Sequence, residues 1–257
     1  MKTDLSVFII ARDEADRIGR TIASVKGLSA DIVVVDSGSS DATVEVARAL
    51  GARVVHKDWA GYGPQKRFGE RQCAFDWVLN LDADEVVSPA LREEIARLLV
   101  AGSRADAYYL RIVDVCPGDD VPRVGAHHHD YVRLYDRRRC GFSESAVHDT
   151  VHLAGPVATA RLKGHVHHFS VRSFARQLEK YNGYSDQLVA DLLAHERRIP
   201  RARLFVEFPA SFVKAYVLRR YFLRGTVGYN LAMNYAFFRF MRLAKYFEAK
   251  GKRKAGR

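Results

Sequence analysis

Acidic side chains follow three apolar runs in the first third of the sequence. Asp82 and Asp84 lie in the segment "NLDADEVVSP", directly after an apolar run. Asp13 and Glu14 follow the run "LSVFIIA", and Asp36 closes the run "DIVVVD". Carboxylate oxygens suit Mg²⁺ or Mn²⁺, and an ion held by one or two carboxylates can neutralise a diphosphate leaving group. Because Asp-x-Asp alone occurs often by chance, its meaning depends on the elements that position it.

Strand-like and helix-like segments alternate through residues 1–100. We expect strands at 5–11, 31–41 (ending in a polar turn), 53–57 and 77–85, and helices at 13–28, 41–52 and 66–74. This alternation predicts an α/β fold with a mainly parallel sheet and helices on both faces. Ligands of such sheets bind beyond the carboxyl ends of the strands, so the three acidic segments should meet at one rim. Any single acid could instead be an ordinary turn or cap residue.

The later part of the chain is less regular and becomes strongly basic. We expect strands at 107–113, 131–136 and 151–155 and a helix at 172–198. Residues 201–257 contain 14 Lys and Arg against 2 Asp and Glu, a net charge of 14 − 2 = +12, whereas the whole chain carries +11. The first 200 residues are therefore close to neutral, and an anionic surface is the expected partner of the C-terminal region.

Aromatic residues interleave with the basic residues of the C-terminal region. This composition is typical of helices that lie in the interface of anionic membranes. A helix packed on the body with a solvated basic end would have a similar composition, and so would a nucleic-acid-binding segment. Because the sequence holds no nucleic-acid recognition motif, we expect a membrane surface and no nucleic acid.

Several motifs resemble those of the inverting family 2 glycosyltransferases. The segments are "FIIARDEADRI", "IVVVDSGSSDATVEVARALGARV" and "PQKRFGERQCAFDWVLNLDADEVVSPAL". The resemblance is strongest over the first 100 residues and continues more loosely through "VRLYDRR", "AVHDTV" and "LKGHVHHFS". These later segments are most similar to the subgroup that contains bacterial lipopolysaccharide core β-glucosyltransferases.

The resemblance implies an α/β fold of the GT-A type, with a Rossmann-like nucleotide-binding sheet and a helical, basic and aromatic C-terminal extension. Residues 1–171 would form the glycosyltransferase domain, in which 1–100 bind the nucleotide sugar and 101–171 carry the acceptor and catalytic half. Residues 172–257 would form a helical region that associates with membranes.

Carried over motif by motif, the resemblance assigns the donor site. Asp13 and Glu14 would line the nucleotide pocket, and Asp36 would contact the uracil or the ribose. Lys66 would lie near the base or the phosphates, and Asp82 would reach the ribose or the metal.

The metal and the catalytic base are assigned in the same way. Asp84 would ligate Mg²⁺ or Mn²⁺ directly, beside Asp82, and His168 would approach the ion from the far side. Asp149 would be the base that accepts the proton of the acceptor hydroxyl, with Glu144 as the alternative. The histidine clusters 127–129 and 165–168 also leave open a zinc site, although no cysteine has a matching spacing.

The resemblance therefore implies a metal-dependent inverting glycosyltransferase that uses a UDP-sugar. We expect transfer of glucose to a cell-envelope glycolipid, the lipopolysaccharide inner core, by an enzyme in the cytoplasm that is peripheral on the inner membrane. A polyprenyl phosphate or another polysaccharide is the alternative acceptor, and a non-catalytic binding protein is the alternative outside enzymes.

Overall fold

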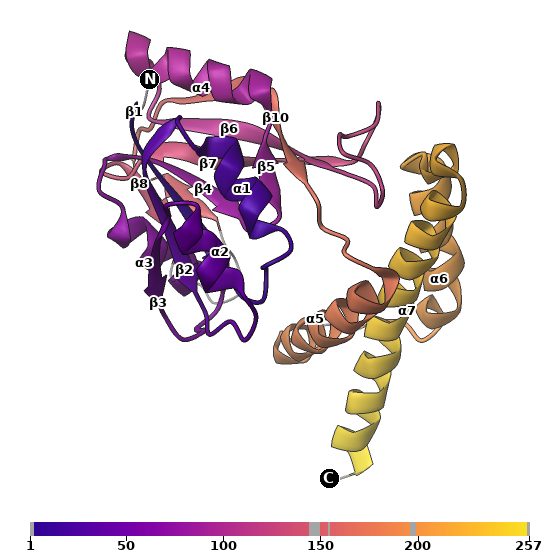
Figure 1. Ribbon diagram of the computed structural model, residues 1–257. Coiled ribbons are helices and arrows are strands. Elements are labelled where there is room, and N and C mark those ends of the chain that lie inside the picture. The colour runs from indigo at the N-terminus through magenta and orange to yellow at the C-terminus, as the bar shows by residue number, and fades with distance from the viewer. Residues whose placement is uncertain (1–2, 144–149, 154, 196–198, 256–257) are drawn as a thin grey trace. The chain divides into compact units, whose positions relative to one another are not determined.

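The computed structural model (Figure 1) describes residues 3–143, 150–153, 155–195 and 199–255 of the chain. They form two units. Residues Met1–Val115 and His128–Phe169 make an α/β unit, and residues Cys116–His127 and Ser170–Arg257 make a mainly helical unit.

Four parallel strands form the first half of the sheet. Their order is β3-β2-β1-β4, and every neighbouring pair is parallel. The strands are β1 (Thr3–Ala11), β2 (Ser29–Asp36), β3 (Arg53–His56) and β4 (Trp77–Asp82). β1 is buried along nearly its whole length, which is why its sequence is an apolar run and not an alternating pattern. The predicted parallel sheet is confirmed for these strands.

The second half of the sheet is mixed, so the complete sheet is less parallel than predicted. β7 is antiparallel to both β4 and β6, β10 is parallel to β6, and β5 is antiparallel to β10. A separate pair is formed by β8 and β9. These strands are β5 (Glu85–Val87), β6 (Ala107–Asp114), β7 (His128–Asp136), β8 (Cys140–Phe142), β9 (Val151–Leu153) and β10 (Thr159–His168). Because β6 and β7 are antiparallel, their connection needs no crossover helix, and none lies between them.

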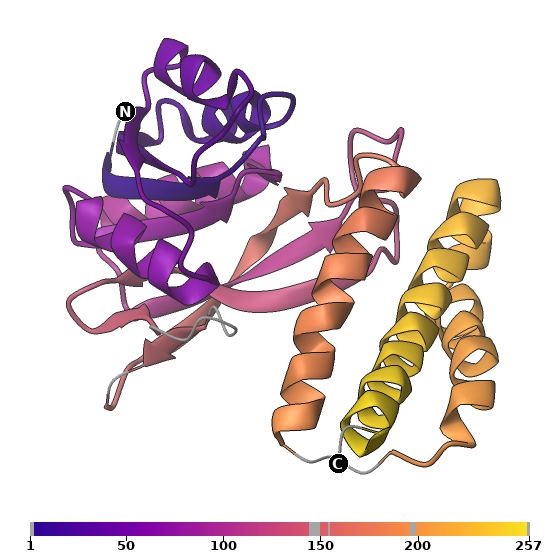
Figure 2. The same ribbon diagram turned by 90° about the horizontal axis from the view of Figure 1, so that it is seen from below.

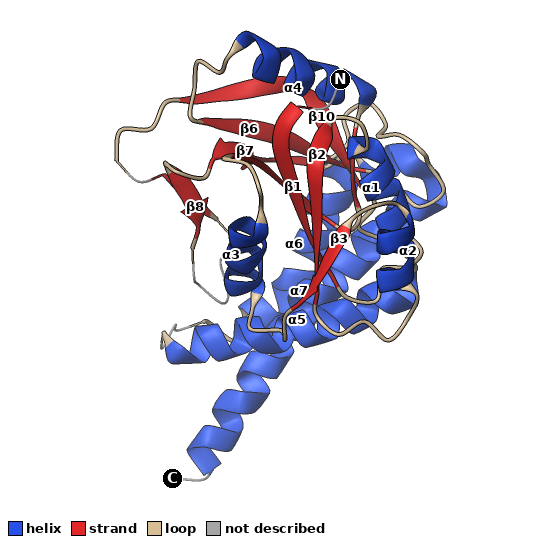
Figure 3. Cartoon of the chain, turned by 60° about the vertical axis from the view of Figure 1, so that its left-hand side comes forward, coloured by secondary structure: helices blue, strands red, loops and turns tan. Residues whose placement is uncertain are grey.

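Helices cover both faces of the parallel strands, as predicted (Figure 3). Alternate residues of β1 face opposite ways, so Val7 and Ile9 join one core while Phe8 joins the other. The helices are α1 (Ile18–Val25), α2 (Thr43–Ala49) and α4 (Pro89–Ala101) on the first face and α3 (Tyr62–Gln72) on the second. α3 begins earlier than predicted because Pro64 lies in its first turn, where the missing N–H has no intrahelical partner to lose.

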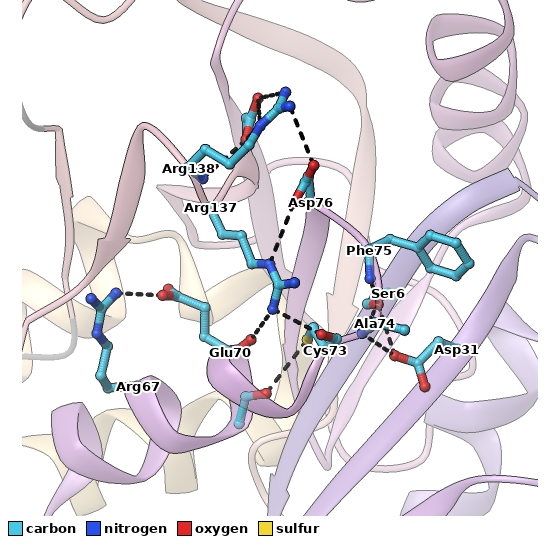
Figure 4. Close-up of polar contacts among 12 residues, drawn as sticks. Ser6, Asp31, Arg67, Glu70, Cys73, Ala74, Phe75, Asp76, Arg137 and Arg138 are labelled. Atoms are coloured by element: carbon cyan, nitrogen blue, oxygen red, sulfur yellow. Dashed lines mark hydrogen bonds and ion pairs between the residues drawn. The ribbon is translucent and has the colours of Figure 1, made fainter.

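The connection from α3 to β4 is held by Ser6 of β1 and by Arg137, which directly follows β7 (Figure 4). The Ser6 hydroxyl accepts hydrogen bonds from the backbone N–H groups of Ala74 and Phe75, each at 3.0 Å. Arg137 donates to the carbonyl groups of Glu70 at 3.1 Å and of Cys73 at 2.8 Å. These contacts fix where β4 begins, and the regular rise of a strand then fixes where its acidic end emerges.

The second unit consists of three packed helices and a short connecting segment. The helices are α5 (Phe174–Ala194), α6 (Arg203–Val213) and α7 (Gly225–Ala255), with η1 (Lys214–Leu218) and η2 (Tyr221–Arg224) between α6 and α7. α7 lies between α5 and α6 (Figure 2). α5 confirms the predicted helix at 172–198. None of the helices in the described part of the chain is both long and apolar enough to cross a membrane.

Gly164 allows β10 to pass close to α4. A Cβ atom at this position would lie 2.4 Å from Leu91 Cα and 2.6 Å from Leu91 N, which are backbone atoms that cannot move aside freely. We expect Gly164→Ala to lower the free energy of unfolding by about 1–3 kcal/mol, measured by urea denaturation. Gly19→Ala is the control, because its Cβ would have only ordinary contacts at 3.6 Å. Equal stabilities of the two variants would contradict the close approach.

Candidate active site

The carboxyl ends of the parallel strands bring the predicted acidic residues to one rim. In the sheet register Ala11 lies beside Asp36, and Ile10 lies beside Asp82. Asp13, which follows β1, therefore lies at the same edge as Asp36 and Asp82. The prediction that the three acidic segments meet at one rim is confirmed.

Asp82 lies between two cationic side chains. Its Oδ1 is 2.9 Å from the Lys66 ammonium, and its Oδ2 accepts a hydrogen bond from Arg133 at 3.1 Å. Lys66 is fully buried and lies over the ring of Phe142, 5.6 Å from its centroid. Burial alone would raise the pKa of Asp82, but the Lys66 and Arg133 charges hold this pKa well below its ordinary value. Asp82 is therefore an anion whose two oxygens both have partners.

Arg133 was not predicted from the sequence, yet it connects three polar groups of the site. It donates to Asp82, to Glu85 Oε1 at 3.0 Å and to the Asn80 side chain. Glu85 is buried, and this burial raises its pKa although Arg133 lies beside it. Part of this cluster could be read from the sequence, because side chains alternate along a strand and Asn80 and Asp82 of β4 must therefore point to the same side. The pairing of β4 with β7 could not be read from the sequence, however, and this pairing brings Arg133 close enough to bond both residues.

Asp84 and His168 lie next to each other although 84 positions separate them in the sequence. His168 Nε2 is 3.6 Å from Asp84 Oδ2, and its Nδ1 is 3.1 Å from Asp114. Burial would lower the pKa of His168, but the hydrogen bonds with Asp114 and Asp84 raise it to about 10. The two carboxylates therefore favour the protonated, cationic form of His168. Asp84 has a lowered pKa, because His168 and Arg17 outweigh its burial.

Arg17 is a second residue that the sequence did not identify. It donates to Asp84 at 3.2 Å and to the carbonyl group of Phe169 at 3.0 Å, and it forms an ion pair with Glu14. It thus connects the segment after β1 with the ends of β4 and β10. Glu14 also contacts the start of α2, because its backbone N–H donates to the Thr43 hydroxyl at 2.7 Å.

Asp13 and Asp36 shape the loops that follow β1 and β2. Asp13 has a positive φ of 54°, and its carboxylate accepts a hydrogen bond from Ser40 N–H at 2.8 Å. The hydrogen bonds from Ser40 lower the pKa of Asp13. Asp36 is buried and accepts from the N–H groups of Gly38 at 3.0 Å and Ser39 at 3.1 Å. Its observed contacts are those of a turn, and its contact with a nucleotide stays a prediction.

Two of the three predicted metal ligands, Asp84 and His168, lie next to each other. Among the described residues, no group of three or more His, Cys, Asp or Glu side chains is arranged to hold a metal. Asp84 and His168 lie close enough to share one ion, and protein cations contact both Asp82 and Asp84. Mg²⁺ and Mn²⁺ sites commonly use one or two protein ligands and fill the other positions with phosphate oxygens and water.

A cavity of about 340 Å³ opens beside this network. Asp82, Glu85, Arg133 and His168 line it, together with the rings of Tyr109, His129, Tyr131 and Phe142. Its volume is in the range of small-molecule sites. The proposed base Asp149 and its alternative Glu144 lie outside the described residues.

Comparisons with known proteins give a consistent picture. Residues 6–154 match the family described as "Glycosyl transferase family 2". The chain is 38% identical over 250 residues to an uncharacterized glycosyltransferase of Rickettsia prowazekii, covering 94% of this chain and 86% of that protein. It is 31% identical to the lipopolysaccharide core biosynthesis glycosyltransferase LpsC of Rhizobium meliloti, covering 96% of this chain and 93% of that protein.

Among solved structures, glucosyl-3-phosphoglycerate synthase of Mycobacterium tuberculosis is similar to part of the chain. This structure contains Mn²⁺, UDP and glucosyl-3-phosphoglycerate. The identity is 25%, the similarity covers 45% of each chain, and the TM-score is 0.36.

Removing Arg133 should destabilise the α/β unit. In Arg133→Met the buried carboxylate of Glu85 would lose its cation, so we expect the free energy of unfolding to fall by about 3–5 kcal/mol. Arg97→Met, at an exposed position of α4, should change it by less than about 0.5 kcal/mol. Urea denaturation measures both variants, and an Arg133→Met protein as stable as the Arg97→Met protein would contradict this network.

Proposed function

Because the chain belongs to glycosyltransferase family 2, we propose that it transfers a hexose from a UDP-sugar, with inversion and with a divalent metal, to a cell-envelope glycolipid. The observation that carries this proposal is the convergence of Asp84 and His168 beside the cation-bound Asp82 at the carboxyl rim. The proposed donor is UDP-glucose and the proposed acceptor is the lipopolysaccharide inner core.

The rim residues supply the proposed donor site. Asp13, Glu14 and Asp36 belong to two loops that hydrogen bonds hold together, and we assign to them the nucleoside end of the donor. Lys66 and Asp82 form an ion pair in which the lysine is buried, and we propose that this pair binds the ribose and the phosphates. A fixed ammonium group near a diphosphate would favour the charge that develops when the sugar leaves.

Asp84 and His168 would hold Mg²⁺ or Mn²⁺ together with diphosphate oxygens. When bound, the metal supplies positive charge that makes the diphosphate a better leaving group. His168 must lose its proton to serve as a ligand, because a metal binds the neutral imidazole. Asp114 would then keep the ring oriented through Nδ1, 3.1 Å away, as such outer partners of metal-bound histidines commonly do.

The sugar-accepting hydroxyl needs a base on the face opposite the leaving diphosphate. We assign this role to Asp149, with Glu144 as the alternative. Both follow β8 in the sequence, and Phe142 of β8 lines the cavity. This cavity is therefore our proposed acceptor site, with Tyr109, His129 and Tyr131 available to pack against sugar rings.

The acceptor assignment rests on the relative LpsC, whose name states lipopolysaccharide core biosynthesis and which is similar over nearly the whole chain. A lipid-linked acceptor of this kind is made at a membrane. We therefore propose that residues 172–257 associate with an anionic membrane surface and that the enzyme works on the inner face of the inner membrane. The strongly basic charge of residues 201–257 supports this location.

Metal-dependent binding of UDP is the first prediction of this proposal. Calorimetric titration should show that Mn²⁺ strengthens UDP binding to the wild type, and that Asp84→Ala weakens binding with Mn²⁺ by at least about tenfold. Asp58→Ala is the matched control, because the Asp58 side chain is fully exposed. UDP binding that is equally strong in Asp84→Ala would contradict the proposed donor site.

Replacement of the proposed base separates the two classes of acceptor. For a sugar hydroxyl acceptor, Asp149→Ala should lower kcat by roughly 10²–10⁴-fold while UDP affinity stays unchanged. A phosphate acceptor is already an anion and needs little base catalysis, so unchanged transfer would favour a polyprenyl phosphate. A radiolabelled transfer assay with extracted glycolipid measures the kcat of both variants, Asp149→Ala and Glu144→Ala. A loss of activity in Glu144→Ala alone would assign the role of the base to Glu144.

A further inference from the structure

Helix α6 buries two polar side chains and exposes several apolar ones. Glu207 and Ser211, four positions apart, are buried, whereas Val206 and Val213 are exposed on the other side. Phe205 is 80% exposed. An ordinary surface helix turns its apolar side toward the core, so the exposed apolar side chains of α6 depart from that pattern.

The buried side of α6 is satisfied by basic residues. Glu207 accepts hydrogen bonds from Arg203 at 2.8 Å and Arg239 at 2.7 Å, and Arg242 lies 3.8 Å away. These contacts stabilise the carboxylate and join α6 to α7. Because α7 lies between α5 and α6 (Figure 2), the opposite side of α6 faces away from the other two helices of this unit.

Exposed apolar side chains continue beyond α6 into η1 and η2. We define the apolar patch as Phe205, Val206, Val213, Val217, Leu218, Phe222 and Leu223. These are seven of the eighteen large apolar side chains that are exposed in the described part of the chain, and they lie within nineteen consecutive residues. Such a concentration marks an interaction surface, because scattered exposed apolar residues are the norm elsewhere.

The charges around the apolar patch identify its partner. The exposed charged residues of 199–224 are all basic: Arg201, Arg203, Lys214 and Arg220. The single acid of this segment, Glu207, is buried and neutralised. A surface of apolar and basic side chains without an exposed carboxylate matches the interface of an anionic bilayer, where apolar groups enter the acyl boundary and basic groups meet phosphates.

We propose that residues 202–223 insert the apolar patch into the interface of an anionic lipid bilayer. The inference deepens the membrane association of the proposed function by naming the inserted segment, which precedes the basic end of α7. Vesicle binding itself requires no glycosyl transfer, so the two proposals can fail separately.

Insertion depth is the direct test. The full chain is mixed with vesicles of phosphatidylglycerol and phosphatidylcholine, with a tryptophan placed at the patch by Leu218→Trp. We expect its fluorescence, taken as the difference from the wild type with its own Trp59 and Trp77, to shift to the blue and to be quenched by brominated acyl chains. Val100→Trp is the control, because Val100 is 67% exposed on α4, outside the patch. Quenching of neither or of both tryptophans would overturn the proposal.

Binding strength is the second readout. Phe205→Ser with Leu218→Ser should reduce the vesicle partition coefficient by at least about tenfold, because two large apolar groups are lost from the interface. Val100→Ser should leave it unchanged, and UDP titration should be equal in all three proteins. Unchanged partition of the double variant would overturn insertion. A second result would also overturn insertion: analytical ultracentrifugation without vesicles that shows a dimer for the wild type and a monomer for the double variant. The patch would then be a protein interface.

Discussion

The site depends on one electrostatic constraint: the carboxylates at the end of β4, which are Asp82, Asp84 and Glu85, must each be matched by a cation. The parallel strands place Asp82 and Asp84 at the end of β4, with the buried Glu85 beside them. Carboxylates that lie close together raise one another's pKa values, which favours protonation. Lys66 from α3 and Arg133 from β7 instead keep Asp82 ionised. The ionised state of Asp82, at the end of the parallel strands, therefore depends in part on Arg133 from the second half of the sheet.

The same arrangement explains how the rim could receive an anionic ligand. Protein cations surround the carboxylates, and His168 lies between Asp84 and Asp114, which favour its protonated form. In our proposal Asp84 and His168 would hold a divalent ion once His168 has lost its proton, and Lys66, fixed by burial, would supply further positive charge to a diphosphate. The site would then be organised before the donor binds, so that little side-chain movement is needed for transfer.

The sequence allowed the rim to be predicted because β1, β2 and β4 are continuous apolar runs that end in acids. It did not reveal Arg17 and Arg133, since their partners are 67 and 51 positions away and depend on strand pairing. β10 was missed because its segment is polar and rich in histidine, and its place in the sheet comes from its pairing with β6 and β5. The basic composition of the C-terminal region can be read from the sequence, but the burial of Glu207 and Ser211 on α6 depends on packing against α7.

The most direct test of the site is the identity of the atoms bound to the metal. Electron spin echo measurements on Mn²⁺ bound with UDP detect nitrogen nuclei in the first coordination shell. We predict a histidine nitrogen coupling in the wild type and its loss in His168→Asn, with UDP still bound. A Mn²⁺–UDP complex without nitrogen coupling, or with the same coupling in the variant, would contradict the assignment of His168 and Asp84 as the pair that holds the metal.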